Sequence, residues 1–236
     1  MPKTFKHSGD MGDIIFSLPA VRALGGGILY LDPEGGVKSE VVTFNGKKRT
    51  KLTAAMIDMM TPVLLQQPYI TEVRHWHGEA VDYDLDFFRN HLQYNNLSDS
   101  HLSIFGLPHS ERDTAWIQVA DPIVVPEKPF VISRSVRYHG NYSFWEGSLP
   151  NIGDKCVYVG YPKEYEIFVY TFGHEVQYYP TPDILTLARV IAGSNLFISN
   201  QGLPHALAEG MKLKLINEVY THRPSGLFKR QGAQYV

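Results

Sequence analysis

Apolar residues recur with the period of a helix over residues 183–192, and residues 196–199 form a short, mostly apolar run. The first pattern predicts a helix that stops at Gly193, and the second predicts a buried strand. Residues 200–205 then form a polar turn that contains a glycine, and good helix formers resume at Ala206. This order leaves backbone N–H groups and the positive end of a helix dipole facing one point, which can bind phosphate.

The start of the chain repeats the same order. A strand is expected over 4–7, a glycine-containing turn over 8–13, and a helix over 14–24 that stops at three consecutive glycines. The remaining expected elements are strands over 28–31, 68–73, 83–88, 130–133, 155–160 and 175–178, a helix over 52–67, a polar loop over 134–150 and a short helix after residue 160. Alternating strands and helices with a glycine turn in each half predict an α/β protein of two doubly wound, Rossmann-like domains.

Length and composition are compatible with two small domains. The chain has 236 residues, 44% of them hydrophobic, and prolines at 122, 126 and 129 interrupt the pattern, so we expect domains over 1–119 and 120–236.

The formal net charge of -2 argues against a protein that coats nucleic acid. A single cysteine, Cys156, excludes an internal disulfide and a cysteine-based zinc site. Without a signal-like start or an apolar stretch of membrane-spanning length, we expect a soluble, cytoplasmic protein.

Several short motifs resemble one family in the same order along most of the chain. Gly12-Asp13, followed by Leu18-Pro19, resembles the opening motif of the ADP-heptose:lipopolysaccharide heptosyltransferases, glycosyltransferase family 9. Residues 64–73 are similar to that family's helix-to-strand element, and residues 191–210 to its donor-binding signature. Residues 83–86 and 106–108 fall where the family has similar motifs.

The resemblance implies a GT-B-like architecture, with two Rossmann-like domains facing across a cleft. The first would bind the acceptor and the second a nucleotide-sugar donor. The family inverts the anomeric centre without a metal, so no cofactor and no metal site are expected. The implied function is glycosyl transfer to an acceptor hydroxyl of a glycan or a lipopolysaccharide-like molecule.

A carboxylate near the cleft is needed to deprotonate the acceptor hydroxyl as it attacks. Asp13 matches the family's catalytic position. The alternative role for Asp13 is a carboxylate placed at a helix start by the dipole. Asp10 is the second candidate for the base, although a helix cap suits it better.

The leaving nucleoside diphosphate needs fixed donors, which in a metal-free site are cations and helix N-termini. Arg134 and Arg137 follow the first strand of the second half, where the family places phosphate-facing basic groups, although either arginine could be an ordinary surface residue. His205 could donate to phosphate or be structural. The residues expected to bind the donor are Gly12, Arg134, Arg137, Asn200, Gln201, Gly202 and His205. The family usually has Asp-Ser or Asp-Thr at positions 200 and 201, which leaves open a catalytically inactive nucleotide-sugar binder.

Other signals are weaker. The alternating aspartates at 82–86 and the pair His75 and His77 could suggest a metal, but both patterns are typical of strands. The basic residues at 47–51 are expected in a solvated loop. Family members are typically longer, and a compact form would suit a phage, where the acceptor could be a hydroxylated nucleobase in DNA. A further alternative is a GT-B-fold epimerase acting on the nucleotide sugar alone.

Overall fold

The computed structural model describes residues 2–35, 52–91, 96–222 and 225–236. The chain divides into two compact units, Met1–Trp116 and Ile117–Val236, whereas the sequence pattern placed a boundary near residue 120. Every paired strand in both units is parallel to its neighbour. Parallel sheets connected by helices make this an α/β protein, as predicted. The basic residues at 47–51 lie outside the described residues.

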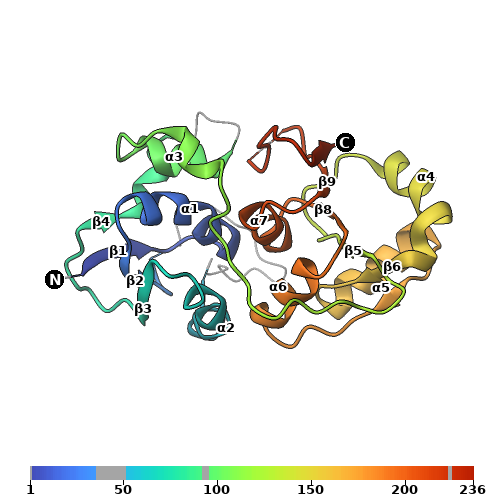
Figure 1. Ribbon diagram of the computed structural model, residues 1–236, viewed down its shortest axis with the longest axis horizontal. Coiled ribbons are helices and arrows are strands. Elements are labelled where there is room, and N and C mark those ends of the chain that lie inside the picture. Colours follow the sequence, from blue (N-terminus) through green and yellow to red (C-terminus); the bar gives the residue numbers. More distant parts are fainter. Residues whose placement is uncertain (1, 36–51, 92–95, 223–224) are drawn as a thin grey trace. The chain divides into compact units, whose positions relative to one another are not determined.

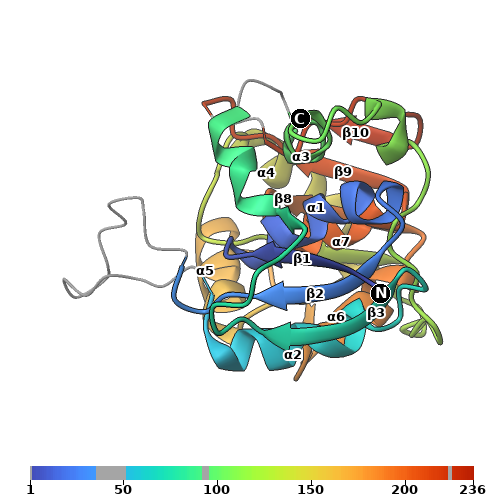
Figure 2. The same cartoon turned by 90° about the vertical axis from the view of Figure 1, so that its left-hand side faces the viewer.

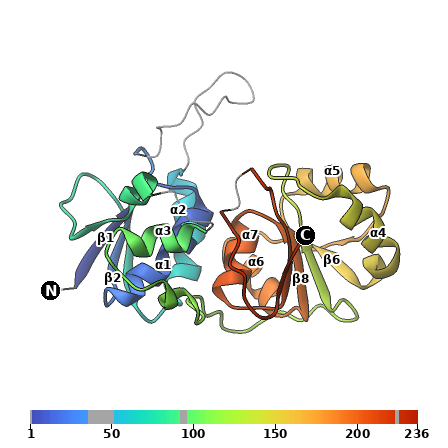
Figure 3. The same cartoon turned by 90° about the horizontal axis from the view of Figure 1, so that it is seen from above.

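Unit 1 is built on a four-stranded sheet in the order β3-β2-β1-β4. Its elements are β1 (Lys3–His7), α1 (Met11–Ala23), β2 (Gly27–Leu31), α2 (Ala54–Leu64), β3 (Ile70–His75), β4 (Tyr83–Asp84), 3₁₀ helix η1 (Leu85–His91), α3 (Leu97–Ser103) and 3₁₀ helix η2 (His109–Arg112). Helices α1 and α2 lie on the same side of the sheet (Figure 1, Figure 3), and Figure 2 shows β1, β2 and β3 side by side. Phe5 in β1, Leu29 in β2 and Leu18 in α1 are fully buried and belong to the core of this unit.

The predicted strand over 83–88 is wrong after its first two residues. The chain leaves the sheet because Asp84 Oδ1 accepts the backbone N–H of Asp86 at 2.9 Å, a local bond that favours a turn over continued strand pairing. Leu85–His91 is therefore a 3₁₀ helix. The turn brings Asp86 to the loop after β1.

Unit 2 is built on a six-stranded sheet in the order β10-β9-β8-β5-β6-β7. Its elements are β5 (Phe130–Ser133), α4 (Tyr142–Ile152), η3 (Gly153–Lys155), β6 (Cys156–Tyr158), α5 (Pro162–Phe172), β7 (Gln177–Tyr178), α6 (Ile184–Ala192), β8 (Leu196–Asn200), α7 (Leu203–Gly210), β9 (Leu215–Glu218) and β10 (Ala233–Tyr235). Helices α6 and α7 cover one face of the sheet, and α4 and α5 cover the other (Figure 1, Figure 3). Cys156 belongs to the buried core, where burial raises the pKa of its thiol to about 12.

The predicted polar loop over 134–150 is wrong from Tyr142 onward, where helix α4 begins. The side chain of Asn141 caps it by accepting the N–H of Phe144 at 3.0 Å. Trp145 and Leu149, four residues apart, bury the inner face of the helix. Gly147 and Pro150 obscured this short apolar pattern in the sequence.

The strand order reverses at one point in each sheet. In unit 1, β1 lies between β2 and β4, and in unit 2, β5 lies between β6 and β8. Ligands of open α/β sheets bind outside the carboxyl ends of the strands at such switch points. The topology thus selects the loops after β1 and β4 in unit 1, and those after β5 and β8 in unit 2. Among the described residues, no helix is both long and apolar enough to cross a bilayer.

Candidate functional site

The loop that follows β1 leads directly into helix α1. The carbonyl oxygen of Asp10 accepts the N–H groups of Asp13 at 2.9 Å and Ile14 at 3.2 Å. Asp10 thus occupies the predicted cap position, but its side chain makes no capping hydrogen bond. The first turn of α1, with Asp13 in it, therefore starts at the switch point of unit 1.

Gly9 allows the Asp13 side chain to lie against this loop. A Cβ atom on Gly9 would lie 2.5 Å from His7 Cε1 and 3.0 Å from both Cβ and Oδ2 of Asp13. The Gly9 N–H donates to His7 Nδ1 at 2.8 Å, which fixes the turn. Asp13 is partly exposed, and Gly12 lies beside it within α1. The Asp13 carboxylate therefore lies near the carboxyl end of β1, and its role as the base stays a prediction.

Asp86, in the 3₁₀ helix η1 that follows β4, holds the same loop. Its carboxylate accepts hydrogen bonds from Ser8 N at 3.0 Å, Ser8 Oγ at 2.6 Å, Lys6 Nζ at 3.1 Å and Arg89 Nη1 at 2.6 Å. His7 Nδ1 lies 3.6 Å from it. Although burial by itself raises the pKa of Asp86, the surrounding His7, Ser8 and Arg89 outweigh burial and hold that pKa well below its usual range. Asp86 is therefore an ionised anchor.

A lysine fills the space between three carboxylates near this loop. Lys6 Nζ lies 3.7 Å from Asp32 Oδ2, 3.7 Å from Asp84 Oδ2 and 3.1 Å from Asp86 Oδ2. Within the described ranges, no group of three or more His, Cys, Asp or Glu residues is arranged to hold a metal ion. Lys6 therefore offsets part of the negative charge of the three aspartates, and no residues of the described chain are assigned to a metal.

In unit 2, the fully buried carboxylate of Glu218 organises the loop after β5. It accepts Arg134 Nε at 2.7 Å and Arg134 Nη2 at 3.0 Å, Gly140 N at 2.7 Å, Asn141 N at 3.0 Å and Trp145 Nε1 at 2.8 Å. Burial by itself raises the pKa of Glu218, but Arg134 and the two backbone N–H groups outweigh burial and lower it. Glu218 ends strand β9 and was not among the site residues predicted from the sequence.

The two arginines predicted to face phosphate have different surroundings. Arg134 is only 4% exposed, and its guanidinium pairs with Glu218 and lies 4.9 Å from the ring centre of Tyr142. Arg137 is exposed, 5.2 Å from the ring centre of Tyr138. The structure thus brings Arg137, and not the Arg134 side chain, to the surface of the loop.

Asn200 ends β8 and binds the backbone of the same loop. Its Oδ1 accepts Ser135 N at 2.9 Å, while its Nδ2 donates to Ser135 O at 3.1 Å and to Arg137 O at 2.5 Å. An ionised aspartate has no N–H to donate to the two carbonyl oxygens. The amide therefore suits this chain at a position where the resembling family has a carboxylate.

The other side chains of the 200–205 turn are also engaged within unit 2. Gln201 Oε1 accepts Tyr220 N at 2.9 Å, and Gln201 Nε2 donates to Ser225 Oγ at 3.1 Å. His205 Nε2 donates to the carbonyl oxygen of Gly226 at 3.0 Å, and burial lowers the pKa of His205. Helix α7 begins after Gly202, which has an extended backbone and offers no side-chain cap. The first turn of α7 is therefore the part of this segment best suited to meet an anion.

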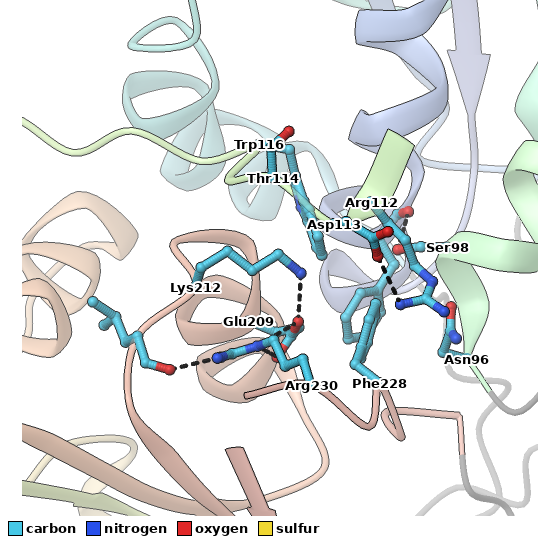
Figure 4. A network of polar contacts seen from close by, with 12 residues as sticks. Asn96, Ser98, Arg112, Asp113, Thr114, Trp116, Glu209, Lys212, Phe228 and Arg230 are labelled. Atoms are coloured by element: carbon cyan, nitrogen blue, oxygen red, sulfur yellow. Dashed lines mark hydrogen bonds and ion pairs between the residues drawn. The ribbon is translucent and has the colours of Figure 1, made fainter. Parts of the chain in front are cut away.

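A second buried carboxylate in unit 2 is structural. Glu209 in α7 accepts Lys212 Nζ at 2.7 Å and Arg230 Nε at 2.9 Å, as Figure 4 shows. Arg230 Nη2 also donates to Leu213 O at 2.6 Å. These contacts fasten the segment before β10 to helix α7.

Two residues that hold the candidate loops, Asp86 and Glu218, were not predicted from the sequence as site residues. Asp86 was considered only within a possible metal motif, and Glu218 was not considered. A charged residue within a short apolar strand, as in Leu215–Glu218, is the signal that could have identified Glu218. The hydrogen-bond partners of Glu218 come from distant segments and could not be predicted from the sequence.

Solved structures share this architecture. Heptosyltransferase WaaC from E. coli with ADP-2-deoxy-2-fluoro heptose matches with a TM-score of 0.56 and 12% identity, over 100% of this chain and 93% of that chain. A glycosyltransferase family 9 protein from Veillonella parvula DSM 2008 matches with a TM-score of 0.62 and 11% identity, over 99% and 86%. E. coli ADP-heptose LPS heptosyltransferase II matches with a TM-score of 0.52 and 12% identity, over 100% and 90%.

No family model matches the chain, and no curated protein sequence matches it. At identities this low, the structural likeness establishes the fold. The chain therefore has the heptosyltransferase-like fold of glycosyltransferase family 9, and the resemblance predicted from the sequence is confirmed at that level.

Proposed function

We propose that this protein is a metal-independent, inverting glycosyltransferase that moves a sugar from a nucleotide-sugar donor to an acceptor hydroxyl. The observation that carries the proposal is the placement of Asp13 at the switch point of unit 1, on a fold shared with heptosyltransferases. One such neighbour was solved with an ADP-sugar analogue. Unit 1 would bind the acceptor, unit 2 would bind the donor, and the two would face each other across a GT-B cleft.

In the proposed reaction, the oxygen of the acceptor hydroxyl attacks the anomeric carbon of the donor sugar, and Asp13 accepts the proton that this hydroxyl loses. The bond between that carbon and the diphosphate oxygen breaks, and the nucleoside diphosphate leaves with the bonding electron pair. Arg137 and the first turn of α7 would stabilise the negative charge that develops on the leaving group. Arg134 would contribute through the shape of the loop, because its guanidinium is paired with Glu218.

The acceptor would be a glycan or a lipopolysaccharide-like molecule. A hydroxylated nucleobase in phage DNA is a narrower proposal that rests on the basic residues at 47–51.

Two alternatives predict different products. A catalytically inactive binder is suggested by Asn200, whose amide replaces a carboxylate and is engaged by the loop. Such a binder would hold nucleotide sugars without turnover. An epimerase of the same fold would convert the donor with no acceptor present.

The test begins with a thermal-shift panel of nucleotides and nucleotide sugars, because selective binding stabilises the folded state. Mass spectrometry then follows transfer from the selected donor to glycan, lipopolysaccharide-core and hydroxymethylated-DNA acceptors. We expect transfer by the wild type and a loss of about 10²-fold to 10⁴-fold in Asp13→Asn, with donor binding retained. The matched control, Asp10→Asn, should transfer at a near wild-type rate because the Asp10 side chain makes no capping bond. Acceptor-independent conversion of the donor, or equal transfer by Asp13→Asn, would contradict the proposal.

A further inference from the structure

We propose that Asn200 and Glu218 act together as a clamp that fixes the β5–α4 loop, residues 134–141, and thereby positions Arg137 for the diphosphate of the donor. The inference rests on the proposed function, because it concerns the donor site of the same enzyme. Neither residue would touch the donor. Both would act through the loop.

The two residues are neighbours in the sheet. Asn200 and Glu218 are direct partners in the register of β8 and β9, and both lie at the carboxyl ends of these strands. Their exposed fractions are 3% and 0%. Partners in a parallel pair lie side by side on the sheet, so the clamp is built into the edge at which unit 2 has its switch point.

The clamp grips the loop at both ends. Asn200 binds the backbone of Ser135 and the carbonyl oxygen of Arg137, at the start of the loop. Glu218 binds the Arg134 side chain at the start of the loop and the N–H groups of Gly140 and Asn141 at its end. The tip of the loop, residues 136–139, is held between these two sets of bonds.

The tip contains backbone strain that the clamp can maintain. Tyr138 has φ of 59°, in the left-handed region that non-glycine residues rarely adopt. Such conformations persist where the surrounding contacts determine them, and they cluster at ligand sites. The adjacent Arg137 is exposed, although the backbone on both sides of the tip is fixed. A cation whose backbone is held in this way loses less conformational entropy on binding phosphate than one on an unrestrained loop.

The roles of the two clamp residues follow from their hydrogen-bond chemistry. Asn200 must both donate and accept, which an ionised carboxylate cannot do. Glu218 accepts five hydrogen bonds, two of them from Arg134, which use its carboxylate fully. A carboxylate at position 200, or the loss of the carboxylate at position 218, would therefore disrupt the loop.

The test is calorimetric binding of ADP to the full chain, with adenosine as a second ligand that lacks phosphate. Asn200→Asp should weaken ADP binding by about tenfold or more, because the new carboxylate would face two carbonyl oxygens. Adenosine binding should change little. The matched control is Asn195→Asp, the same substitution at an exposed position next to the opposite end of β8, and it should bind ADP like the wild type.

A double-mutant cycle separates positioning from a general structural effect. Arg137→Ala should weaken ADP binding, and adding Asn200→Asp to it should cause little further loss, since the clamp acts through Arg137. Glu218→Gln should behave like Asn200→Asp if it folds, which its thermal unfolding without ligand will show. Additive losses in the cycle, an equal loss of adenosine binding, or unchanged ADP binding in Asn200→Asp would overturn the inference. Failure of the wild type to bind any of ADP, GDP, UDP and CDP would instead overturn the proposed function.

Discussion

Hydrogen-bond donors converge on one carboxylate in each unit. The carboxylate of Asp86 accepts four hydrogen bonds, two from Ser8, one from Lys6 and one from Arg89. The carboxylate of Glu218 accepts five, and both residues hold the loop that follows the first strand of their unit. Ionised acceptors in buried sites form strong bonds and are costly to remove. The positions of both candidate loops thus depend on a carboxylate, and the β5–α4 loop depends on Asn200 as well.

The pH dependence of unit 1 should reveal Asp86. Since its folded pKa lies below the unfolded value of about 3.9, its stabilisation is fully present above pH 4 and is lost as the pH falls further. Asp86→Asn should cost about 2–3 kcal/mol at pH 7 and should flatten the loss of stability below pH 4. Urea titrations at several pH values, with hydrogen-exchange labelling of β1 and α1 peptides, measure this. A variant with the wild-type acid dependence would contradict the role of Asp86.

The two arginines of the β5–α4 loop should differ in their contribution to stability. Arg134→Met leaves Glu218 buried without its cation, so we expect a loss of about 3–5 kcal/mol in the free energy of unfolding. Arg137→Met changes an exposed side chain and should stay within about 0.5 kcal/mol of wild type. Urea unfolding of the two variants makes the comparison. Equal losses would show that the Arg134 pair is not a structural requirement.

Elements with a clear hydrophobic period were predictable, and those defined by distant contacts were not. Strand β5 (Phe130–Ser133) and helix α6 (Ile184–Ala192) have the predicted positions. Helix α4 was not predicted because Gly147 and Pro150 interrupt its apolar pattern, although its Trp145 side chain is buried in the core. The strand predicted over 83–88 was shortened by a side-chain bond of Asp84. Periodicity reports burial, but it does not report local bonds that end a strand.

The turn between β1 and α1 should tolerate no side chain at Gly9. Gly9→Ala places a methyl group against His7 and Asp13, so we expect a loss of about 1–3 kcal/mol and reduced transfer. Gly147→Ala is the matched control, because it lies inside α4 with no atom within 4 Å of the new methyl group, and it should be neutral or stabilise by up to about 1 kcal/mol. Thermal unfolding of both variants tests this. A harmless Gly9→Ala would show that Asp13 does not depend on this turn.

At the level of the whole molecule, the order of motifs predicted the α/β class and the heptosyltransferase-like fold. It also predicted Asp13 and the 200–205 turn as site positions, and these lie next to the two switch points. The sequence did not indicate that Arg134 would be paired with Glu218, because the two are 84 positions apart. The roles of the individual site residues remain predictions that binding and transfer measurements test.

The most direct test of the proposed donor site is hydrogen exchange of the wild-type chain with and without the nucleotide sugar that stabilises it most in the thermal-shift panel, with helix α6 as an internal reference. Bound donor should slow exchange in residues 134–141 and 200–205, because both loops lie at the switch point of unit 2. The nucleoside diphosphate of the same donor, added alone, should protect the same residues. Binding that leaves both loops unchanged, or protection confined to other segments, would contradict a donor site at this edge of the sheet.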